Sequence, residues 1–297
     1  MFDKKTIRKW ILLSGILFCM AESMAASNPE FEYGKIESAG ISMPYRFATL
    51  NKGVSGKPAL VIYLHGGSSK GADNERQMLE AGIDSIANYL TEKKIQAFFL
   101  VPQCPADKSW GGPMLGVLKA MIEEYKKDKI DDDRIYILGG SMGGTGTWSM
   151  VSAYPGLFAA AMPVAGNPSK CIAENVVQTP VFTVMGTADR IMNVETASDF
   201  INELNSLGGT TKFDIEEGWT HEVTCIQSYT ADRLDWIFGH TRNSSGIENP
   251  ETDCKILESV QYYSLDGRPL SESPRKGFYI ERLRYNDGSI ATVKRLK

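Results

Sequence analysis

The sequence predicts an α/β fold in which helices flank a mostly parallel central sheet, with a small β module at the C-terminus. Three observations predict it. Short apolar runs alternate with helical patterns along the middle of the chain, which is typical of parallel strands joined by crossover helices. One apolar run ends in a glycine-x-serine-x-glycine turn around Ser141. Near residue 241 the composition changes, and strand-like segments separated by Asp-Gly turns replace the alternation.

Composition limits the class of protein. The chain has 297 residues, of which 42% are hydrophobic and 23% charged, so it has ample material for a globular core. A net charge of -4 and the lack of a Lys/Arg-rich stripe argue against nucleic-acid binding. The cysteine and histidine spacing does not suggest zinc, and the acidic run 131–133 lacks the glycine and glutamate of a calcium loop. We therefore expect no metal and no cofactor, and the sequence does not indicate an oligomeric state.

Residues 1–25 have the pattern of a signal peptide. A basic segment containing Lys4 and Arg8 precedes an apolar run, 10–20, and small residues stand at Ser23 and Ala25. The apolar run is shorter than the roughly 20 residues that a membrane span requires, which favours cleavage over retention as an anchor. The sequence thus predicts a secreted or periplasmic protein without a membrane span after cleavage, and it leaves attachment to the cell surface open.

Cleavage would leave four cysteines in an environment that permits disulfides. They are Cys104, Cys171, Cys225 and Cys254, and four cysteines allow three complete pairings. Buried free thiols are an equally good interpretation, because cysteine is often buried without a partner. A bridge through Cys225, close to His221, is one option that the sequence leaves open.

Each element of the α/β region, 26–240, has a local reason. The run Ala59–Leu64 is apolar throughout, as in a strand covered on both faces, and Met114–Lys127 is amphipathic with helical spacing. The predicted strands, in order, lie in 31–50, 59–64, 97–101, the run before Ser141, 158–164, 181–185 and 212–216. The predicted helices, in order, are 74–91, 114–127, 145–153, 196–207 and 228–238.

The C-terminal part of the chain has a different organisation. Residues 241–255 are rich in Asn, Ser, Gly, Glu and Pro and are predicted to be a linker. Residues 256–297 alternate strand-like segments, 259–265, 277–285 and 290–294, with turn sequences. A module of about forty residues is below the size that usually folds alone.

The catalytic hypothesis starts from Ser141. A serine hydroxyl becomes a good nucleophile only when a base accepts its proton, and the base needs a third group to orient it. The chain has three histidines. His65 lies in a glycine-rich loop after a central strand, and His240 lies at the edge of the linker, which leaves His221, in a loop after a late strand, as the base.

The acid should follow a strand and precede the histidine. Asp189 does so directly after the apolar run 181–186, whereas Asp199 falls inside a predicted helix and Asp214 inside a predicted strand. The order Ser141, Asp189, His221 is the one expected for an α/β-hydrolase sheet.

From about Leu60 to Phe238 the chain resembles the α/β-hydrolase superfamily, in particular its secreted prolyl-oligopeptidase-like or feruloyl-esterase-like group, carbohydrate esterase family 1 among them. The matching segments are Leu64-His65-Gly66-Gly67, Val101-Pro102-Gln103-Cys104-Pro105 with Trp110, Arg134-Ile135-Tyr136-Ile137, Gly139-Gly140-Ser141-Met142-Gly143-Gly144 and Met185-Gly186-Thr187-Ala188-Asp189.

This resemblance implies roles for further residues. The backbone N–H groups of Met142 and Gly67 would bind the oxyanion of a tetrahedral intermediate. Gln103, Trp110 and Trp219 are candidates for the wall of the substrate site, with simple packing as the alternative for all three. The loops around 103–116 and 166–178 would set specificity.

The resemblance implies a serine carboxylesterase whose partner is an acylated oligo- or polysaccharide, such as xylan carrying feruloyl or acetyl esters. Two alternatives stay open: a prolyl-oligopeptidase-like serine peptidase, and a glycan-binding protein on an inactive hydrolase fold. The C-terminal segment, with Tyr262-Tyr263-Ser264-Leu265-Asp266-Gly267-Arg268, resembles the tails of secreted Bacteroidetes proteins that are related to a sorting domain.

Overall fold

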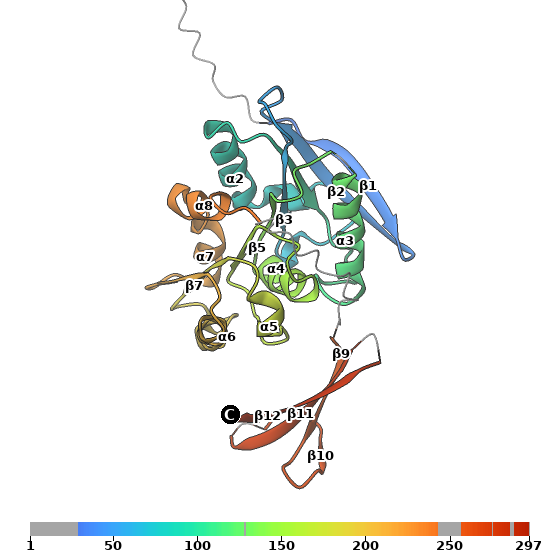
Figure 1. Ribbon diagram of the computed structural model, residues 1–297, viewed down its shortest axis with the longest axis vertical. Helices are drawn as coiled ribbons and strands as arrows, with labels where there is room; N and C mark the ends of the chain where they lie inside the picture. The colour runs from blue at the N-terminus through green and yellow to red at the C-terminus, as the bar shows by residue number, and fades with distance from the viewer. Residues whose placement is uncertain (1–28, 128, 243–256, 275, 286–287, 297) are drawn as a thin grey trace, which may run out of the picture.

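The computed structural model describes residues 29–127, 129–242, 257–274, 276–285 and 288–296. Within them the chain forms two separate sheets, an eight-stranded one and a four-stranded one (Figure 1). The predicted signal peptide, 1–25, and nearly all of the predicted linker, 241–255, lie outside the described residues. The domain boundaries therefore stay predictions.

The eight-stranded sheet has the order β1-β2-β4-β3-β5-β6-β7-β8. Strand β2 pairs antiparallel with both β1 and β4. The remaining neighbours, β4, β3, β5, β6, β7 and β8 in that order, pair in parallel. The bounds are β1 Glu32–Ser38, β2 Ile41–Leu50, β3 Ala59–Leu64, β4 Ala97–Pro102, β5 Ile135–Gly140, β6 Ala160–Val164, β7 Val181–Gly186 and β8 Thr211–Glu216.

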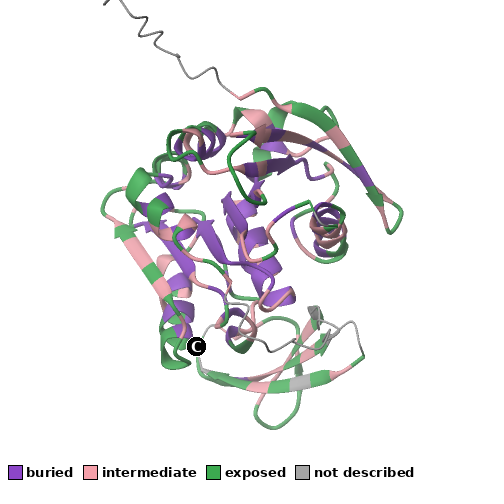
Figure 2. Ribbon diagram, turned by 45° about the horizontal axis from the view of Figure 1, so that its top comes forward, coloured by how far each residue is buried: buried purple, intermediate pink, exposed green. Residues whose placement is uncertain are grey.

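Helices cover both faces of this sheet, as Figures 1 and 2 show. Successive residues of β3 point to opposite faces, so Leu60, Ile62 and Leu64 join one buried cluster while Val61 and Tyr63 join the other. Helices α3 to α6 contribute to the first cluster, and α2 and α8 to the second. The bounds are α2 Ala81–Glu92, α3 Pro113–Lys126, α4 Met142–Ala153, α5 Ala173–Val176, α6 Val194–Ser206, α7 His221–Gln227 and α8 Ala231–Phe238.

Two helix predictions need correction. The segment 74–91 is not one helix: a 3-10 turn, η2 (Arg76–Leu79), precedes α2, because Glu80 has extended backbone angles and interrupts the helical run. The loop predicted around His221 is instead the start of α7, whose first turn is capped by the Thr220 side chain accepting from the Val223 N–H. The predicted helix 228–238 accordingly begins later, at Ala231.

The C-terminal sheet is antiparallel, with the order β10-β9-β11-β12. Its strands are β9 Leu257–Tyr263, β10 Pro269–Leu270, β11 Phe278–Tyr285 and β12 Ile290–Leu296. Across the described parts of the chain, every helix is too short or too polar to traverse a lipid bilayer.

Candidate active site

The sharp turn around Ser141 joins strand β5 to helix α4. Ser141 has φ 58° and ψ -118°, a conformation that is strained for a residue with a side chain. The glycines of the motif allow the turn to pack tightly. A Cβ on Gly143 would lie 1.8 Å from the Leu64 carbonyl oxygen, and a Cβ on Gly139 would lie 2.6 Å from the same atom. The elbow is therefore pressed against the end of β3, the strand at the centre of the sheet.

Ser141, His221 and Asp189 come together in one chain of hydrogen bonds. The Ser141 Oγ lies 2.7 Å from His221 Nε2, and His221 Nδ1 lies 2.7 Å from Asp189 Oδ2. The Asp189 side chain is fully buried and that of His221 nearly so. Asp189 accepts a hydrogen bond from the Nδ1–H of His221, which leaves Nε2 to accept a hydrogen bond from the Ser141 hydroxyl.

The surrounding backbone fixes the acid and the base relative to each other. The second oxygen of Asp189, Oδ1, accepts from the backbone N–H groups of Ile191 and Met192 at 2.8 and 2.9 Å. The Ala188 N–H donates to the Trp219 carbonyl at 3.1 Å, which ties the loop after β7 to the loop before α7. A Cβ on Gly186 would lie 2.2 Å from that same carbonyl, so only glycine permits this approach.

The loop after β3 approaches the serine from the other side. A Cβ on Gly66 would lie 3.7 Å from the Ser141 Cβ. The Gly66 N–H donates to Glu80 Oε1 at 3.2 Å, whereas the exposed Gly67 begins the 3-10 turn η1 (Gly67–Ser69). Met142 likewise begins α4. The N–H of a first helical residue has no partner within its own helix, so the residues named as oxyanion donors are placed where such donors are free.

His65 is a structural residue of this loop. Its ring is buried, its Nδ1 donates to the Gly66 carbonyl at 2.6 Å, and its Nε2 accepts from the Cys104 N–H at 2.9 Å. Burial lowers the pKa of His65 to about 4. A neutral imidazole with both nitrogens engaged cannot serve as a general base, which leaves His221 for that role.

Two of the three residues predicted for the substrate wall are buried instead. Gln103 and Trp110 are 0% and 2% exposed, so neither presents a surface to substrate. The Gln103 side chain donates to the Ser69 carbonyl and accepts from the Asn74 N–H, and the Trp110 indole N–H donates to the His65 carbonyl. The prediction was wrong because both side chains turn inward and support the loop that carries Gly67.

Trp219, the third of these residues, is half-buried and lies in the loop before α7, the helix that begins at His221. Its ring lies 5.8 Å from the guanidinium carbon of Arg233. Contact between Trp219 and substrate stays a prediction.

The described cysteines are unpaired, so no disulfide joins Cys104, Cys171 and Cys225 to one another. Cys254 lies outside the described residues. Cys225 packs behind the elbow, with its Sγ 3.4 Å from the place a Cβ on Gly140 would occupy. Burial raises the pKa of the Cys225 thiol to about 12, which keeps it protonated and inert.

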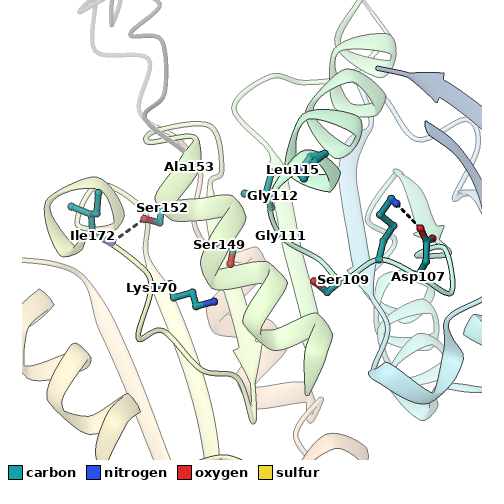
Figure 3. A pocket seen from close by; sticks show the side chains of 12 residues that line it. Asp107, Ser109, Gly111, Gly112, Leu115, Ser149, Ser152, Ala153, Lys170 and Ile172 are labelled. Atoms are coloured by element: carbon teal, nitrogen blue, oxygen red, sulfur yellow. Dashed lines mark hydrogen bonds and ion pairs between the residues drawn. The ribbon is translucent and has the colours of Figure 1, made fainter. Parts of the chain in front are cut away.

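A pocket of about 520 Å³ lies between the two loops predicted to set specificity. Its wall combines residues 107–109, 111–113, Lys170 and Ile172 with one face of α4. Figure 3 shows Ser149 and Lys170 on one side and Ser109 on the loop across from them. Among the described residues, no three or more His, Cys, Asp or Glu side chains gather in a group that could hold a metal ion.

Sequence reasoning missed Glu80. It stands directly before α2, and its carboxylate reaches the loop next to Ser141 through Gly66 and Ser69. No local pattern signals this contact, because the partners lie 14 and 11 residues away in the chain.

Comparisons with known proteins find similarity to esterases and related hydrolases. Residues 106–233 match the dienelactone hydrolase family. The chain is 28% identical over 192 residues to poly(3-hydroxyalkanoate) depolymerase C of Paucimonas lemoignei, covering 61% of this chain and 45% of that protein. It is 25% identical over 226 residues to a probable carboxylesterase of Oryza sativa subsp. japonica, covering 64% of this chain and 81% of the other.

A solved structure of a thermostable esterase superposes with a TM-score of 0.66 at 29% identity, covering 71% of this chain and 63% of that one. The chain thus spans under half of the Paucimonas protein and about two thirds of the esterase. The fold is the α/β-hydrolase fold, and the segment that carries Ser141, Asp189 and His221 is similar to the dienelactone hydrolase family.

Proposed function

We propose that this protein is a serine carboxylesterase that uses Ser141, His221 and Asp189 as a catalytic triad. The observation that carries the proposal is the hydrogen-bonded chain from a strained, glycine-flanked serine to a histidine and a buried carboxylate. The similarity to the dienelactone hydrolase family and to two esterases supports the same chemistry.

The first half-reaction would form an acyl-enzyme. Ser141 Oγ attacks the ester carbonyl carbon while His221 Nε2 takes the hydroxyl proton, and Asp189 stabilises the resulting imidazolium. The negative charge on the carbonyl oxygen is bound by the N–H groups of Met142 and Gly67. Collapse of the tetrahedral intermediate breaks the ester bond, and His221 returns the proton to the departing alcohol.

The second half-reaction would use water in place of the alcohol. His221 removes a proton from the water, whose oxygen attacks the acyl carbon, and the same two N–H groups bind the second oxyanion. Breakage of the bond to Ser141 releases the carboxylic acid, and Ser141 Oγ regains its proton from His221.

We infer that the substrates are acyl groups on plant cell-wall polysaccharide, feruloyl or acetyl esters of xylan. The motifs around His65, Gln103 and Ser141 support the feruloyl-esterase-like group. The pocket beside α4 has the volume common for small-ligand sites, but none of the three triad residues lines it, so it would hold only a part of the substrate remote from the reacting ester. Lys170, Ser109 and Ser149 supply polar contacts suited to a sugar.

A polyester is the second candidate substrate, because the Paucimonas relative is named as a poly(3-hydroxyalkanoate) depolymerase. An ester panel separates the candidates: p-nitrophenyl acetate, methyl ferulate, acetylated xylan and a 3-hydroxybutyrate oligomer, each with Ser141→Ala as control. Faster turnover of methyl ferulate or acetylated xylan than of the oligomer supports the polysaccharide. If the wild type hydrolyses none of the four, the esterase proposal fails.

Two other functions are tested in the same assay. A proline-containing peptide amide tests the serine peptidase, which requires amide hydrolysis to exceed ester hydrolysis. Binding of xylan by Ser141→Ala, with no hydrolysis by the wild type, would favour a glycan-binding protein on an inactive hydrolase fold.

We also propose that the protein is exported and works in the periplasm or outside the cell. The basic and apolar pattern of residues 1–25 supports export, as does the resemblance of the C-terminal segment to tails of secreted proteins. Fractionation of the native host followed by N-terminal sequencing tests this: full-length protein in the cytoplasm would contradict it, whereas a mature chain beginning at Ala26 supports it.

A further inference from the structure

Glu80 occupies an unusual position for a carboxylate so close to the reaction site. It precedes the first turn of α2, yet its side chain makes no hydrogen bond to its own helix. Its Oε1 instead accepts from the Gly66 N–H at 3.2 Å and from the Ser69 hydroxyl at 2.7 Å. One oxygen thus joins both ends of the short segment that contains Gly67.

Packing holds Glu80 in this place. A Cβ on Gly82, two residues further along, would lie 2.6 Å from the Tyr229 ring and 2.8 Å from the Tyr63 ring, so the start of α2 is seated directly on the two rings. Those rings contact each other edge to face with centroids 5.6 Å apart. Burial raises the pKa of the Tyr63 hydroxyl, and the nearby Glu80 charge raises it further.

Gly66 lies between this carboxylate and the nucleophile. A Cβ added there would be 3.4 Å from Glu80 Oε1 and 3.7 Å from the Ser141 Cβ. The bond to Glu80 occupies the Gly66 N–H, so this group is not available to an oxyanion. The N–H of Gly67, the next residue, has no partner within its 3-10 turn.

We propose that Glu80 is a positioning residue of the oxyanion hole: it binds the Gly66 N–H and the Ser69 hydroxyl and so orients the Gly67 N–H toward the reacting carbonyl. The inference rests on the proposed ester hydrolysis. The carboxylate cannot itself stabilise an oxyanion, because like charges repel, so its contribution passes through the loop. Such an effect belongs to the transition state and lowers kcat more than it changes KM.

The test compares three substitutions at position 80 in the full chain. Glu80→Gln keeps the acceptor oxygen at the same reach and removes the charge, whereas Glu80→Asp keeps the charge and withdraws the oxygen by one methylene. Glu80→Ala removes both. We expect kcat for p-nitrophenyl acetate to fall about ten- to a hundredfold in Ala and Asp, because small displacements of a catalytic group have effects of this size. Glu80→Gln should stay within about threefold of wild type.

The matched control is Glu92→Ala, at the exposed last residue of the same helix, which should leave kcat, KM and Tm unchanged. Tm is measured for every variant. If Glu80→Ala does not fold, the Gln and Asp pair still decides. Equal loss in Gln and Asp, or wild-type kcat in Asp and Ala, overturns the proposal, as does a rise in KM with kcat unchanged.

A second readout separates this inference from the proposed function. The rate at which a fluorophosphonate labels Ser141 needs the nucleophile and the oxyanion hole, and it does not depend on which ester is the natural substrate. We expect labelling to slow in Ala and Asp by the same factor as kcat. A wild type that labels rapidly yet hydrolyses no ester contradicts the proposed function, and the order of the labelling rates still decides on Glu80.

Discussion

The two sheets of this chain are stabilised in different ways. In the eight-stranded sheet, β3, β5 and β7 are buried along their whole length, and two apolar clusters cover the two faces. In the C-terminal sheet Tyr279 is the one buried hydrophobic residue among the side chains described there. The packing on both faces of the first sheet can hold a strained backbone in place. The second sheet depends on its backbone hydrogen bonds and on contacts between exposed side chains.

This difference explains where the strained residues lie. A serine with φ 58° is tolerated because the elbow is clamped between β3 and β6, where its N–H donates to the Val164 carbonyl at 3.0 Å. A strained catalytic turn needs buried strands packed on both sides of it, and the small C-terminal sheet has no such strands among its described residues. The following predictions test the contrast, from the largest expected effect to the smallest.

The first separates chemistry from stability in the large sheet. Ser141→Ala should lower kcat for p-nitrophenyl acetate about 10⁴- to 10⁶-fold, because removal of a serine nucleophile disables the whole triad. Tm should stay close to that of wild type, because alanine keeps the Cβ and the backbone conformation and removes only the hydroxyl. Ser85→Ala on α2, whose hydroxyl bonds only the backbone of its own helix, is the control and should retain full activity. Residual turnover above one hundredth of wild type would count against Ser141 as nucleophile.

The second concerns the tight packing of the elbow. Gly143→Ala should destabilise the protein by about 4 kcal/mol or more, because its Cβ would lie 1.8 Å from a backbone oxygen that cannot move aside. Gly116→Ala, in the exposed face of α3 with nothing near the new Cβ, should instead stabilise by about 0.5–1 kcal/mol. Urea unfolding of both variants measures the two values. Similar shifts for the pair would show that the close contact is relieved elsewhere.

The third uses the pKa of His65, which burial lowers from 6.5 to about 4. The folded state therefore favours neutral His65. The stability that this preference gives is fully present above pH 6.5. It is lost as the pH falls from 6.5 to 4, and the loss at pH 4 is about 3 kcal/mol. His65→Gln keeps an acceptor for the Cys104 N–H without titrating, so its unfolding free energy should fall less between pH 6.5 and 4. Parallel curves for wild type and variant would contradict this assignment.

The fourth addresses the C-terminal sheet. Tyr279→Ala removes its one described buried hydrophobic side chain, whose ring lies 6.1 Å from that of Tyr262. We expect faster proteolysis within residues 257–296, with kcat within about twofold of wild type and the main thermal transition unchanged. A drop in the main Tm or in kcat would show that the two sheets are energetically coupled.

Much of the large sheet could be predicted from sequence, because a strand buried on both faces is apolar throughout and ends at polar or glycine residues. Ala59–Leu64 was located to the residue for this reason. Ser141 and Asp189 could be named because each follows such a strand, and His221 because the other two histidines were excluded, although the chain separates the three widely. The structure brings all three within hydrogen-bonding distance.

The features that could not be predicted are those in which tertiary packing decides whether a side chain is buried and what it contacts. Gln103 and Trp110 combine polar and apolar atoms, so they suit a solvent-facing wall and a buried support equally well, and the tertiary packing chose the latter. The seven-residue helix α7 has too few residues for a helical period to be recognised, and it depends on a cap at Thr220. Glu80 is recognisable only once α2 is seated on Tyr63 and Tyr229.

The two proposed oxyanion donors are main-chain groups, at the first residues of η1 and α4. Every amino acid except proline carries such a group, so most point mutations at Gly67 and Met142 would leave the donor itself in place. Evolution can therefore rework the side chains of the surrounding loops, and with them the choice of ester, without dismantling the charge-stabilising part of the site. A scaffold of this kind is expected to diversify its substrates readily while its reaction stays the same.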